Sequence, residues 1–286
     1  MTNVHFLVKE GKWQVTNFPR RFFFCSFAFK TIKMLSQAKQ KWIRSLELKK
    51  FRQEQGLFLA EGSKCCTDLL ELLPCRFLAA TKSWLEMHPG FRAVEVTEAT
   101  QEEINKASLL KNPQEVLAVF EMPTNVLQSE HFSGTLSLAL DNIQDPGNLG
   151  TILRIADWFG IRQVVCSIGT VDAFNPKTVQ ATMGAIGRIR IQYTDLAAFL
   201  SSVRLPIYGT FLKGEILYEA NLQQEGIIVM GNEGNGISEN IGKWVTNKLF
   251  IPDFPMGHSG SESLNVSVAT AIVCSEFRRQ AISKGG

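Results

Sequence analysis

The chain has 286 residues, 45% of them apolar, and carries 30 basic against 27 acidic side chains, a formal net charge of +3. This length allows two domains with apolar cores, and no apolar run approaches the roughly 20 residues that a membrane-spanning helix needs. Residues 1–33 contain six basic residues and only one acidic residue, Glu10. The remaining 253 residues contain 24 basic and 26 acidic residues. The main body is therefore not globally basic, and any nucleic-acid binding must use a local patch.

The six cysteines form no CxxC pair, and no histidine stands at the spacing of metal ligands. Cys166 and Cys274 lie inside apolar runs, which is typical of small buried hydrophobic residues. We therefore expect no metal site and no disulfide framework, and the cytoplasm as the location.

Residues 1–33 do not read as part of a fold. The stretch RRFFFCSFAF has the composition of a signal-peptide core, but it starts late, at Phe22, and no small-residue cleavage site follows it. The scarcity of acidic residues would also suit an organellar transit peptide. We prefer a disordered extension or a misassigned start, because a recognisable domain begins at Met34.

A basic segment with helical spacing occupies residues 35–52. Lys41, Arg44 and Lys49 can share one solvent-facing side of such a helix. A face of this kind is usually only solvated surface, but a cluster of basic residues on one helix is also a footprint for RNA. The candidate RNA-binding residues are Lys41, Arg44, Lys49, Lys50 and Arg52.

Residues 57–121 alternate between strands and helices. Strands are predicted at residues 57–60 and in CRFLAAT, FRAVEVT and VLAVFEM; helices are predicted at residues 63–73, around 83–87 and in the capped stretch TEATQEEINKAS. This alternation predicts a small α/β domain over residues 34–122. Polar turn formers at residues 123–134 indicate a linker.

A second domain, residues 135–286, opens with a strand at 136–140, a loop at 141–150, a helix at 151–159 and a strand at 164–167. This βαβ unit implies a parallel strand pair with a right-handed crossover. Further buried strands include PIYGTFL and GIIVMGNE. We expect an open, mostly parallel sheet covered by helices, with a ligand at the carboxyl ends of its strands.

Three loops of this domain combine polar and turn-forming residues. The first, residues 141–154, contains Asn148 and Arg154; the second is GNEGNGIS, residues 231–238; the third, residues 253–265, leads into an apolar helix. Ser263 or Asn265 can cap that helix. The second loop lacks both the Walker ending and the G-x-G-x-x-G pattern, so a dinucleotide or P-loop site is not indicated.

Each loop also has a plain interpretation. Arg154 can pair with Asp157 or Asp145 on a helix surface, Glu233 can be a turn residue, and the third loop can be an ordinary capped connection. Each of these interpretations is sufficient for one loop taken alone. The three loops taken together indicate a shared functional site.

In order and spacing, the loops resemble the signature motifs of the SpoU/TrmH family of RNA ribose methyltransferases in the SPOUT superfamily. DNIQDPGNLGTILRIADWFG resembles motif 1, IIVMGNEGNGIS motif 2 and ESLNVSVATAI motif 3. The resemblance covers roughly residues 135–280. Residues 34–121, with KKFRQEQGLFLAEG, resemble the ribosomal-protein-like RNA-binding domain that often precedes this catalytic domain.

The resemblance implies an α/β fold with a deep trefoil knot, S-adenosylmethionine bound in that knot, and a homodimer with RNA near the subunit interface. The residues expected to contact the cofactor are Gly209, Thr210, Gly231, Ile251, Ser263 and Leu264.

The implied reaction is methyl transfer to a ribose 2′-hydroxyl of structured RNA, either ribosomal or transfer RNA. Asn148 and Arg154 match the family's invariant Asn and Arg. Because a guanidinium has a pKa above about 12 and is a poor base, we expect Arg154 to hold the phosphate and the hydroxyl in line. Glu233 and Asn265 are expected to fix Arg154 or the loops around it, and Asn148 to shape its loop.

One departure from the family pattern is a longer loop over residues 253–262. His258 in this loop has the chemistry of a base, although an exposed loop histidine is the preferred interpretation. The alternative function is a non-catalytic RNA-binding or ribosome assembly factor that keeps the fold, which the presence of all four candidate catalytic residues disfavours.

Overall fold

The computed structural model describes residues 6–9, 12–15, 32–124, 132–255 and 263–284, which fall into two compact units, residues 1–30 and 31–286. In the first unit, β1 (Phe6–Lys9) and β2 (Lys12–Val15) pair as an antiparallel hairpin. Residues 32–33 form β3 (Ile32–Lys33), which pairs with β6 (Ala93–Glu98). Whether residues 1–33 are an extension or a misassigned start stays a prediction.

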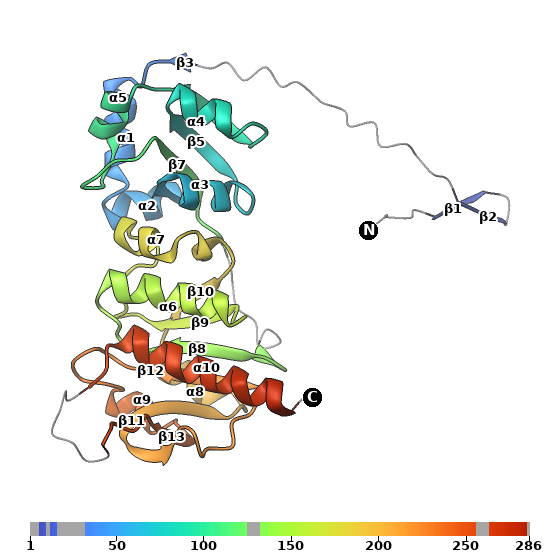
Figure 1. Ribbon diagram of the computed structural model, residues 1–286, viewed down its shortest axis with the longest axis vertical. Helices are drawn as coiled ribbons and strands as arrows, with labels where there is room; N and C mark the ends of the chain where they lie inside the picture. Colours follow the sequence, from blue (N-terminus) through green and yellow to red (C-terminus); the bar gives the residue numbers. More distant parts are fainter. Residues whose placement is uncertain (1–5, 10–11, 16–31, 125–131, 256–262, 285–286) are drawn as a thin grey trace. The chain divides into compact units, whose positions relative to one another are not determined.

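Residues 32–124, here called the N-terminal lobe, are built on a five-stranded mixed sheet with the order β3-β6-β5-β7-β4 (Figure 1). Its further strands are β4 (Leu57–Glu61), β5 (Cys75–Ala80) and β7 (Val116–Glu121), and its helices are α1 (Gln37–Ser45), α2 (Lys49–Gln55), α3 (Ser63–Leu70), α4 (Lys82–Met87) and α5 (Gln101–Ala107). The four predicted strands are confirmed. The capping box of α5 is present between Thr100 and Glu103.

The predicted single helix over residues 35–52 is wrong, because the chain turns between α1 and α2. Ser36 caps the start of α1, and Leu46 at its end is buried. Arg52 Nη1 donates to the carbonyl oxygens of Leu46 (2.7 Å) and Glu47 (2.6 Å), so its guanidinium satisfies groups that a continuous helix would have paired internally.

Residues 132–284, here called the C-terminal lobe, contain a six-stranded sheet in which every neighbouring pair is parallel. Its order is β10-β9-β8-β12-β11-β13. The strands are β8 (Leu136–Leu140), β9 (Gln163–Ser167), β10 (Arg190–Thr194), β11 (Ile207–Ile216), β12 (Gly226–Met230) and β13 (Asn247–Phe250). The helices are α6 (Pro146–Trp158), α7 (Pro176–Thr182), the 3-10 helix η2 (Ala185–Gly187), α8 (Leu196–Ser202), α9 (Glu239–Gly242) and α10 (Val266–Lys284). The predicted parallel α/β sheet is confirmed, while the trefoil knot stays a prediction.

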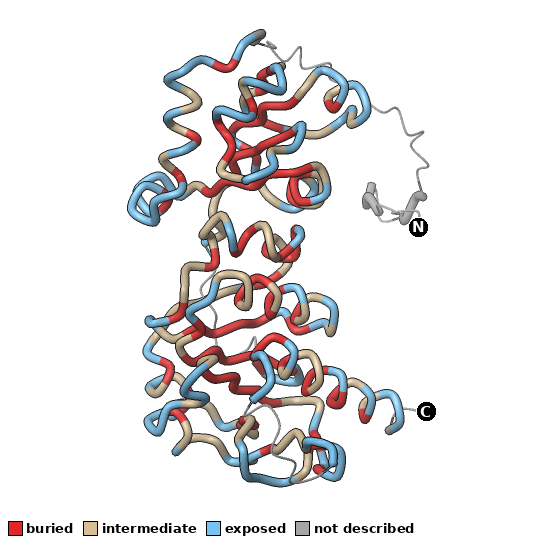
Figure 2. Tube along the Cα trace, turned by 60° about the vertical axis from the view of Figure 1, so that its left-hand side comes forward, coloured by how far each residue is buried: buried red, intermediate tan, exposed pale blue. Residues whose placement is uncertain are grey.

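The central strands β8, β9 and β12 are buried along nearly their whole length, as the red parts of the tube in Figure 2 show. Leu138 and Leu140 of β8 point into the core shared with α6, α7 and α10, whereas Ala139 between them joins the core under α8 and α9. This alternation explains why β8 is apolar at nearly every position. Among the described residues, no helix is long and apolar enough to span a membrane.

Helix α6 begins at Pro146, five residues earlier than predicted, because Asp145 caps it by accepting from Asn148 N at 2.7 Å and proline suits the first turn. Its apolar stripe packs Leu149, Ile152, Leu153 and Ala156 inward. Gly150 lets α7 approach closely, since a Cβ there would lie 2.5 Å from Ala181 Cβ and from Thr178 O.

Candidate functional site

The three candidate loops follow β8, β12 and β13, all at the carboxyl ends of parallel strands. After β8 the chain builds outward through β9 and β10, and it then returns to place β12 on the other side of β8. Such a reversal of direction opens a crevice at the carboxyl ends of the two central strands. The sheet topology therefore brings the loops 141–145 and 231–238 to the same edge.

A chain of side-chain hydrogen bonds joins all three loops through Asn148. Asn148 Nδ2 donates to Glu233 Oε1 at 3.1 Å, and Asn148 Oδ1 accepts from Asn265 Nδ2 at 3.0 Å. Asn265 also caps α10, because its Oδ1 accepts from the backbone N of Ser267 (2.9 Å) and of Val268 (3.3 Å). Of the two predicted caps, Asn265 is the one observed. The residue that starts the last helix is thus also part of the site.

Glu233 is held against the start of α6. Its carboxylate accepts from the backbone N of Gln144 and of Asp145, both at 3.4 Å, and from Asn148 Nδ2. Free N–H groups and the helix dipole both favour an anion at this place. Glu233 is therefore more than a turn residue, because it fixes the loop that carries Asn148.

Three residues outside the predicted site also bind these loops together. Asp141 is 6% exposed, and its Oδ2 accepts from Ser238 N at 2.8 Å. Asn232 Nδ2 donates to Asn142 O at 2.8 Å, and Asn142 adopts a positive φ of 60°. A signal was present in the sequence, since Asp and Asn directly after buried strands are typical of loops that bond to backbone groups.

Arg154 is exposed on α6 and, among the described residues, makes no hydrogen bond or ion pair. Its suggested partners are otherwise engaged: Asp157 pairs with Arg162 and Arg188, and Asp145 caps the helix. Glu233 and Asn265 are expected to fix Arg154 or the loops around it. Both bond to Asn148, at the start of the helix that carries Arg154, and their roles in the reaction stay a prediction. The guanidinium remains directed to solvent, where it can meet a phosphate.

The residues expected to contact the cofactor lie on β11 and on the loops after β12 and β13. Gly209 and Gly231 are buried, Thr210 and Ile251 are half-buried, and Ser263 and Leu264 are exposed. A Cβ on Gly231 would lie 2.2 Å from Gly236 C and from Ile237 N, so only glycine fits this turn. Leu264, on the loop after β13, is an apolar side chain that is 50% exposed, and its contact with the cofactor stays a prediction.

The candidate RNA-binding residues divide into two groups. Lys41, Lys49 and Lys50 are exposed, and Arg44 is exposed while its Nη1 donates to Ser108 O at 2.7 Å, at the end of α5. The prediction for Arg52 is wrong, because Arg52 is only 1% exposed and pairs with Asp172. Helical spacing placed Arg52 with the exposed basic residues, but it could not indicate that Asp172 of the C-terminal lobe pairs with Arg52.

The described part of the chain contains no group of three or more His, Cys, Asp or Glu side chains that could hold a metal ion, and the expectation of a metal-free enzyme stays a prediction. Cys166 and Cys274 are buried, as expected. Burial raises the pKa of the Cys274 thiol to about 12 and raises that of Cys166 as well, so both stay neutral and pack as small apolar groups.

Comparison with known proteins agrees with this geometry. Residues 135–275 match the SpoU rRNA Methylase family, and residues 37–118 match the MRM3-like substrate binding domain. The chain is 29% identical over 267 residues to the 23S rRNA (guanosine(2553)-2'-O)-methyltransferase RlmP of Bacillus subtilis, which covers 87% of this chain and 99% of the relative.

Two solved structures share the fold and the sequence. A putative RNA methyltransferase of the TrmH family from Porphyromonas gingivalis is 40% identical, with a TM-score of 0.77 over 86% of this chain and 99% of that one. An AdoMet-bound rRNA methyltransferase from Sinorhizobium meliloti is 29% identical, with a TM-score of 0.75 over 87% of this chain and 98% of that one. With the three loops joined through Asn148, these matches show that the chain belongs to the SpoU/TrmH family and is an RNA methyltransferase.

Proposed function

We propose that this enzyme methylates a ribose 2′-hydroxyl of ribosomal RNA. The observation that carries the proposal is the hydrogen-bond chain from Asn265 through Asn148 to Glu233, which assembles the three loops into one site. The cofactor is S-adenosylmethionine, as in the AdoMet-bound relative, and the ribosomal target follows the Bacillus subtilis relative, which is named for 23S rRNA. The match to a substrate-binding domain supports RNA contact by the N-terminal lobe.

The cofactor supplies a methyl group on a positively charged sulfur, and the residues of the chain bind and orient the two reactants. Gly209, Thr210 and Gly231 would approach the cofactor through their backbone, and Ile251, Ser263 and Leu264 would close over it. The tight turn at Gly231 and the half-exposed Leu264 support this assignment. Positioning accounts for much of the acceleration, because the methyl carbon must lie about 3 Å from the attacking oxygen.

Arg154 would hold the RNA phosphate and the 2′-hydroxyl in line with the methyl group. Its exposure on α6 and the engagement of Asp145 and Asp157 elsewhere support this role. A guanidinium stabilises developing negative charge on the 2′-oxygen without giving up its own proton. The proton of the 2′-hydroxyl would pass to a phosphate oxygen or to water. Asn148 would fix the conformation of the loop that precedes Arg154.

The enzyme would work as a homodimer in the cytoplasm. Trp158, one turn after Arg154 on α6, is 84% exposed, and Val268 on the adjacent α10 is 49% exposed. Apolar side chains of this size at the surface favour burial against another chain. The free, buried cysteines of the described residues are compatible with a reducing compartment.

The proposal is tested by incubating the purified protein with methyl-labelled S-adenosylmethionine and with separate ribosomal and transfer RNA fractions. We expect label in ribosomal RNA, at a linkage that resists alkaline hydrolysis because the 2′-hydroxyl is blocked. If only transfer RNA were labelled, the methyltransferase activity would be confirmed and the ribosomal target refuted. Tight RNA binding without any label would support the non-catalytic alternative.

A further inference from the structure

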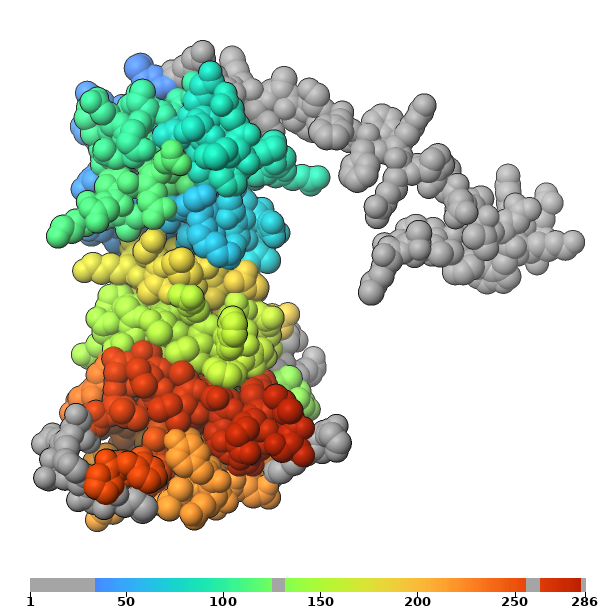
Figure 3. Space-filling view, in the orientation of Figure 1, coloured from blue at the N-terminus to red at the C-terminus, as the bar shows by residue number. Residues whose placement is uncertain are grey.

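The two lobes share one continuous apolar core. A single cluster of buried residues includes Phe58 and Leu69 from the N-terminal lobe together with Leu149 and Val179 from the C-terminal lobe. The rings of Phe58 and Phe174 lie 5.0 Å apart between centroids. In Figure 3 the yellow atoms, which include those of α7, lie between the blue to green N-terminal lobe and the yellow-green part of the C-terminal lobe. An apolar contact of this kind opposes the free movement that lobes with polar contacts usually show.

One buried ion pair crosses this contact. Arg52 Nη2 lies 2.5 Å and Arg52 Nε 3.2 Å from Asp172 Oδ2, while Arg52 Nη1 holds the turn between α1 and α2. The side chains of Arg52 and Asp172 are 2% and 13% exposed. A buried guanidinium that loses its carboxylate leaves an uncompensated charge, so the pair strongly favours one placement of α2.

Asp172 belongs to the loop between β9 and α7, which is tightly held. Its Oδ1 accepts from Phe174 N at 3.0 Å. The Tyr193 hydroxyl donates to Val171 O at 2.5 Å and accepts from Ala173 N at 2.8 Å. Burial raises the pKa of Tyr193, so this hydroxyl keeps the proton that it donates.

The same loop supports the site. Val171 N donates to Ile143 O at 2.8 Å, and Asn142 N donates to Ser167 Oγ at 2.8 Å. Asn142 O in turn accepts from Asn232, the neighbour of Glu233. Hydrogen bonds and chain neighbours together thus connect Arg52, through Asp172 and Val171, to the loops that hold Asn148.

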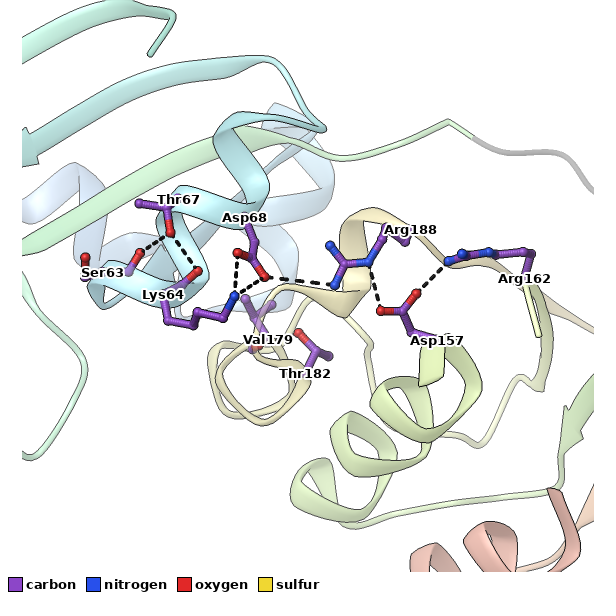
Figure 4. A network of polar contacts seen from close by, with 9 residues as sticks. All are labelled: Ser63, Lys64, Thr67, Asp68, Asp157, Arg162, Val179, Thr182 and Arg188. Carbon is purple, nitrogen blue, oxygen red and sulfur yellow. Dashed lines mark hydrogen bonds and ion pairs between the residues drawn. The ribbon is translucent and has the colours of Figure 1, made fainter. Parts of the chain in front are cut away.

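A second charged contact crosses between the lobes at a more exposed place (Figure 4). Arg188 Nη2 lies 4.0 Å from Asp68 Oδ2 on α3, and Arg188 Nε donates to Asp157 on α6 at 2.8 Å. With Arg188 32% exposed, this contact contributes less than the buried pair. It opposes rotation about the Arg52–Asp172 contact.

We infer that Arg52 and Asp172 are positioning residues for methyl transfer: they hold the RNA-binding helix α2 in one place against the loop beneath motif 1. RNA held by Lys49 and its neighbours is thereby presented with one particular ribose at the site. This inference rests on the proposed function, because it requires RNA on α1 and α2.

The first test uses Asp172→Asn, which keeps the size of the side chain and removes its charge. We expect unchanged affinity for a ribosomal RNA fragment and for S-adenosylmethionine. The single-turnover rate constant at saturating RNA should fall about tenfold or more, since small misplacements are costly, and label should spread to neighbouring riboses. Glu121→Gln is the matched control: it makes the same change in the Arg76–Glu121 pair, which lies inside the N-terminal lobe, and should alter neither rate nor position.

A second measurement needs neither RNA nor cofactor. Dyes on Lys82→Cys and Lys213→Cys, one exposed position in each lobe, report the distance between lobes by energy transfer in a Cys25→Ser background. We expect a narrow distribution for the parent and a broad one for Asp172→Asn. A parent that transfers no methyl group would refute the proposed function and leave this measurement intact.

The inference is overturned if folded Asp172→Asn keeps both the methylated position and the narrow distribution. If that variant does not fold, Arg52→Lys replaces it, because lysine keeps the charge but cannot bond the carboxylate and both carbonyl oxygens together. In the parent protein, RNA binding should slow hydrogen exchange at Val171 and Asn142. Unchanged exchange there would contradict the connection from α2 to the site.

Discussion

Asn148 holds the site together because its single amide group bonds both to a hydrogen-bond acceptor and to a hydrogen-bond donor. It donates to a carboxylate, Glu233, and accepts from an amide, Asn265. An apolar residue would satisfy neither partner, and a carboxylate would satisfy only Asn265. The residue type is therefore set by its two neighbours as well as by any contact with RNA.

Asn148→Asp should abolish most activity, because it places a second carboxylate where Nδ2 now lies 3.1 Å from Glu233 Oε1. We expect a single-turnover rate about 10²-fold lower, and a larger loss than for Asn148→Ala, which removes the amide without adding charge. Asn235→Asp, at an exposed position of the neighbouring loop, serves as control. Equal activity of Asn148→Asp and Asn235→Asp would show that Asn148 does not hold the site.

Arg154→Ala should lower the methylation rate by about 10²–10³-fold, the usual cost of removing one donor from developing negative charge. S-adenosylmethionine affinity, measured by calorimetry, should not change. Arg154→Lys should be intermediate, since an ammonium keeps the charge but lacks the planar fork. Arg204→Ala, an exposed arginine at the amino end of β11, should be fully active; activity in Arg154→Ala would refute the assigned role.

At the scale of elements, the loop after β12 is shaped by backbone contact. Asn232 and Gly236 exchange two hydrogen bonds, 2.8 Å and 2.9 Å long, and Asn232 Oδ1 accepts from Gly234 N. This closes a tight turn directly above Gly231. These hydrogen bonds leave the loop little freedom to move, which suits the proposed contact of its backbone with the cofactor.

Gly231→Ala should weaken cofactor binding, because its Cβ would lie 2.2 Å from the backbone of Gly236 and Ile237 and the turn would have to open. Overpacking of this kind costs about 1–3 kcal/mol, which corresponds to a loss in affinity of about 5- to 150-fold. Gly234→Ala is matched to it, since the nearest atom to that Cβ is a side-chain oxygen at 3.6 Å. Calorimetric titration of both variants distinguishes them, and equal affinity would argue against the loop as part of the cofactor site.

At the scale of the whole molecule, the exposed lysines of α1 and α2 should provide RNA affinity without touching the cofactor. Lys41→Glu combined with Lys49→Glu should weaken RNA binding and reduce its salt dependence by roughly one unit of slope for each lysine that no longer meets a phosphate. The control is Lys82→Glu combined with Lys111→Glu, which makes the same change in charge elsewhere on the N-terminal lobe and should leave RNA binding nearly unchanged. Equal effects of both pairs in a binding titration would refute a local RNA surface.

Trp158→Glu should dissociate the proposed homodimer, because it buries a charge where a large apolar side chain would meet the partner. Light scattering should then give the monomer mass of 31.9 kDa where the parent gives twice that value. Leu212→Glu changes another exposed apolar residue, 76% exposed on β11, and should leave the mass unchanged. A parent protein that is itself monomeric would contradict the proposal.

Local patterns in the sequence determined the elements and the motifs. The alternation of apolar residues, the caps at Asp145 and Thr100, and the order of three loops after buried strands all depend on neighbours within a few positions. Such patterns predicted the parallel sheet, the family and the edge where the site lies. The prediction placed the start of α6 five residues late, although the Asp145 cap and Pro146 are local signals for it. It also missed the break between α1 and α2, which the buried Arg52 stabilises by bonding to Leu46 O.

Only the tertiary structure decided which side chains act on one another. Glu233 meets Asn148 across 85 positions, and Asn265 meets Asn148 across 117. Arg52, predicted on the RNA surface, lies buried against Asp172, which is 120 positions away. Helical spacing shows that a charged residue lies on a face, but the partner that compensates its burial comes from another part of the chain, and no local pattern contains it.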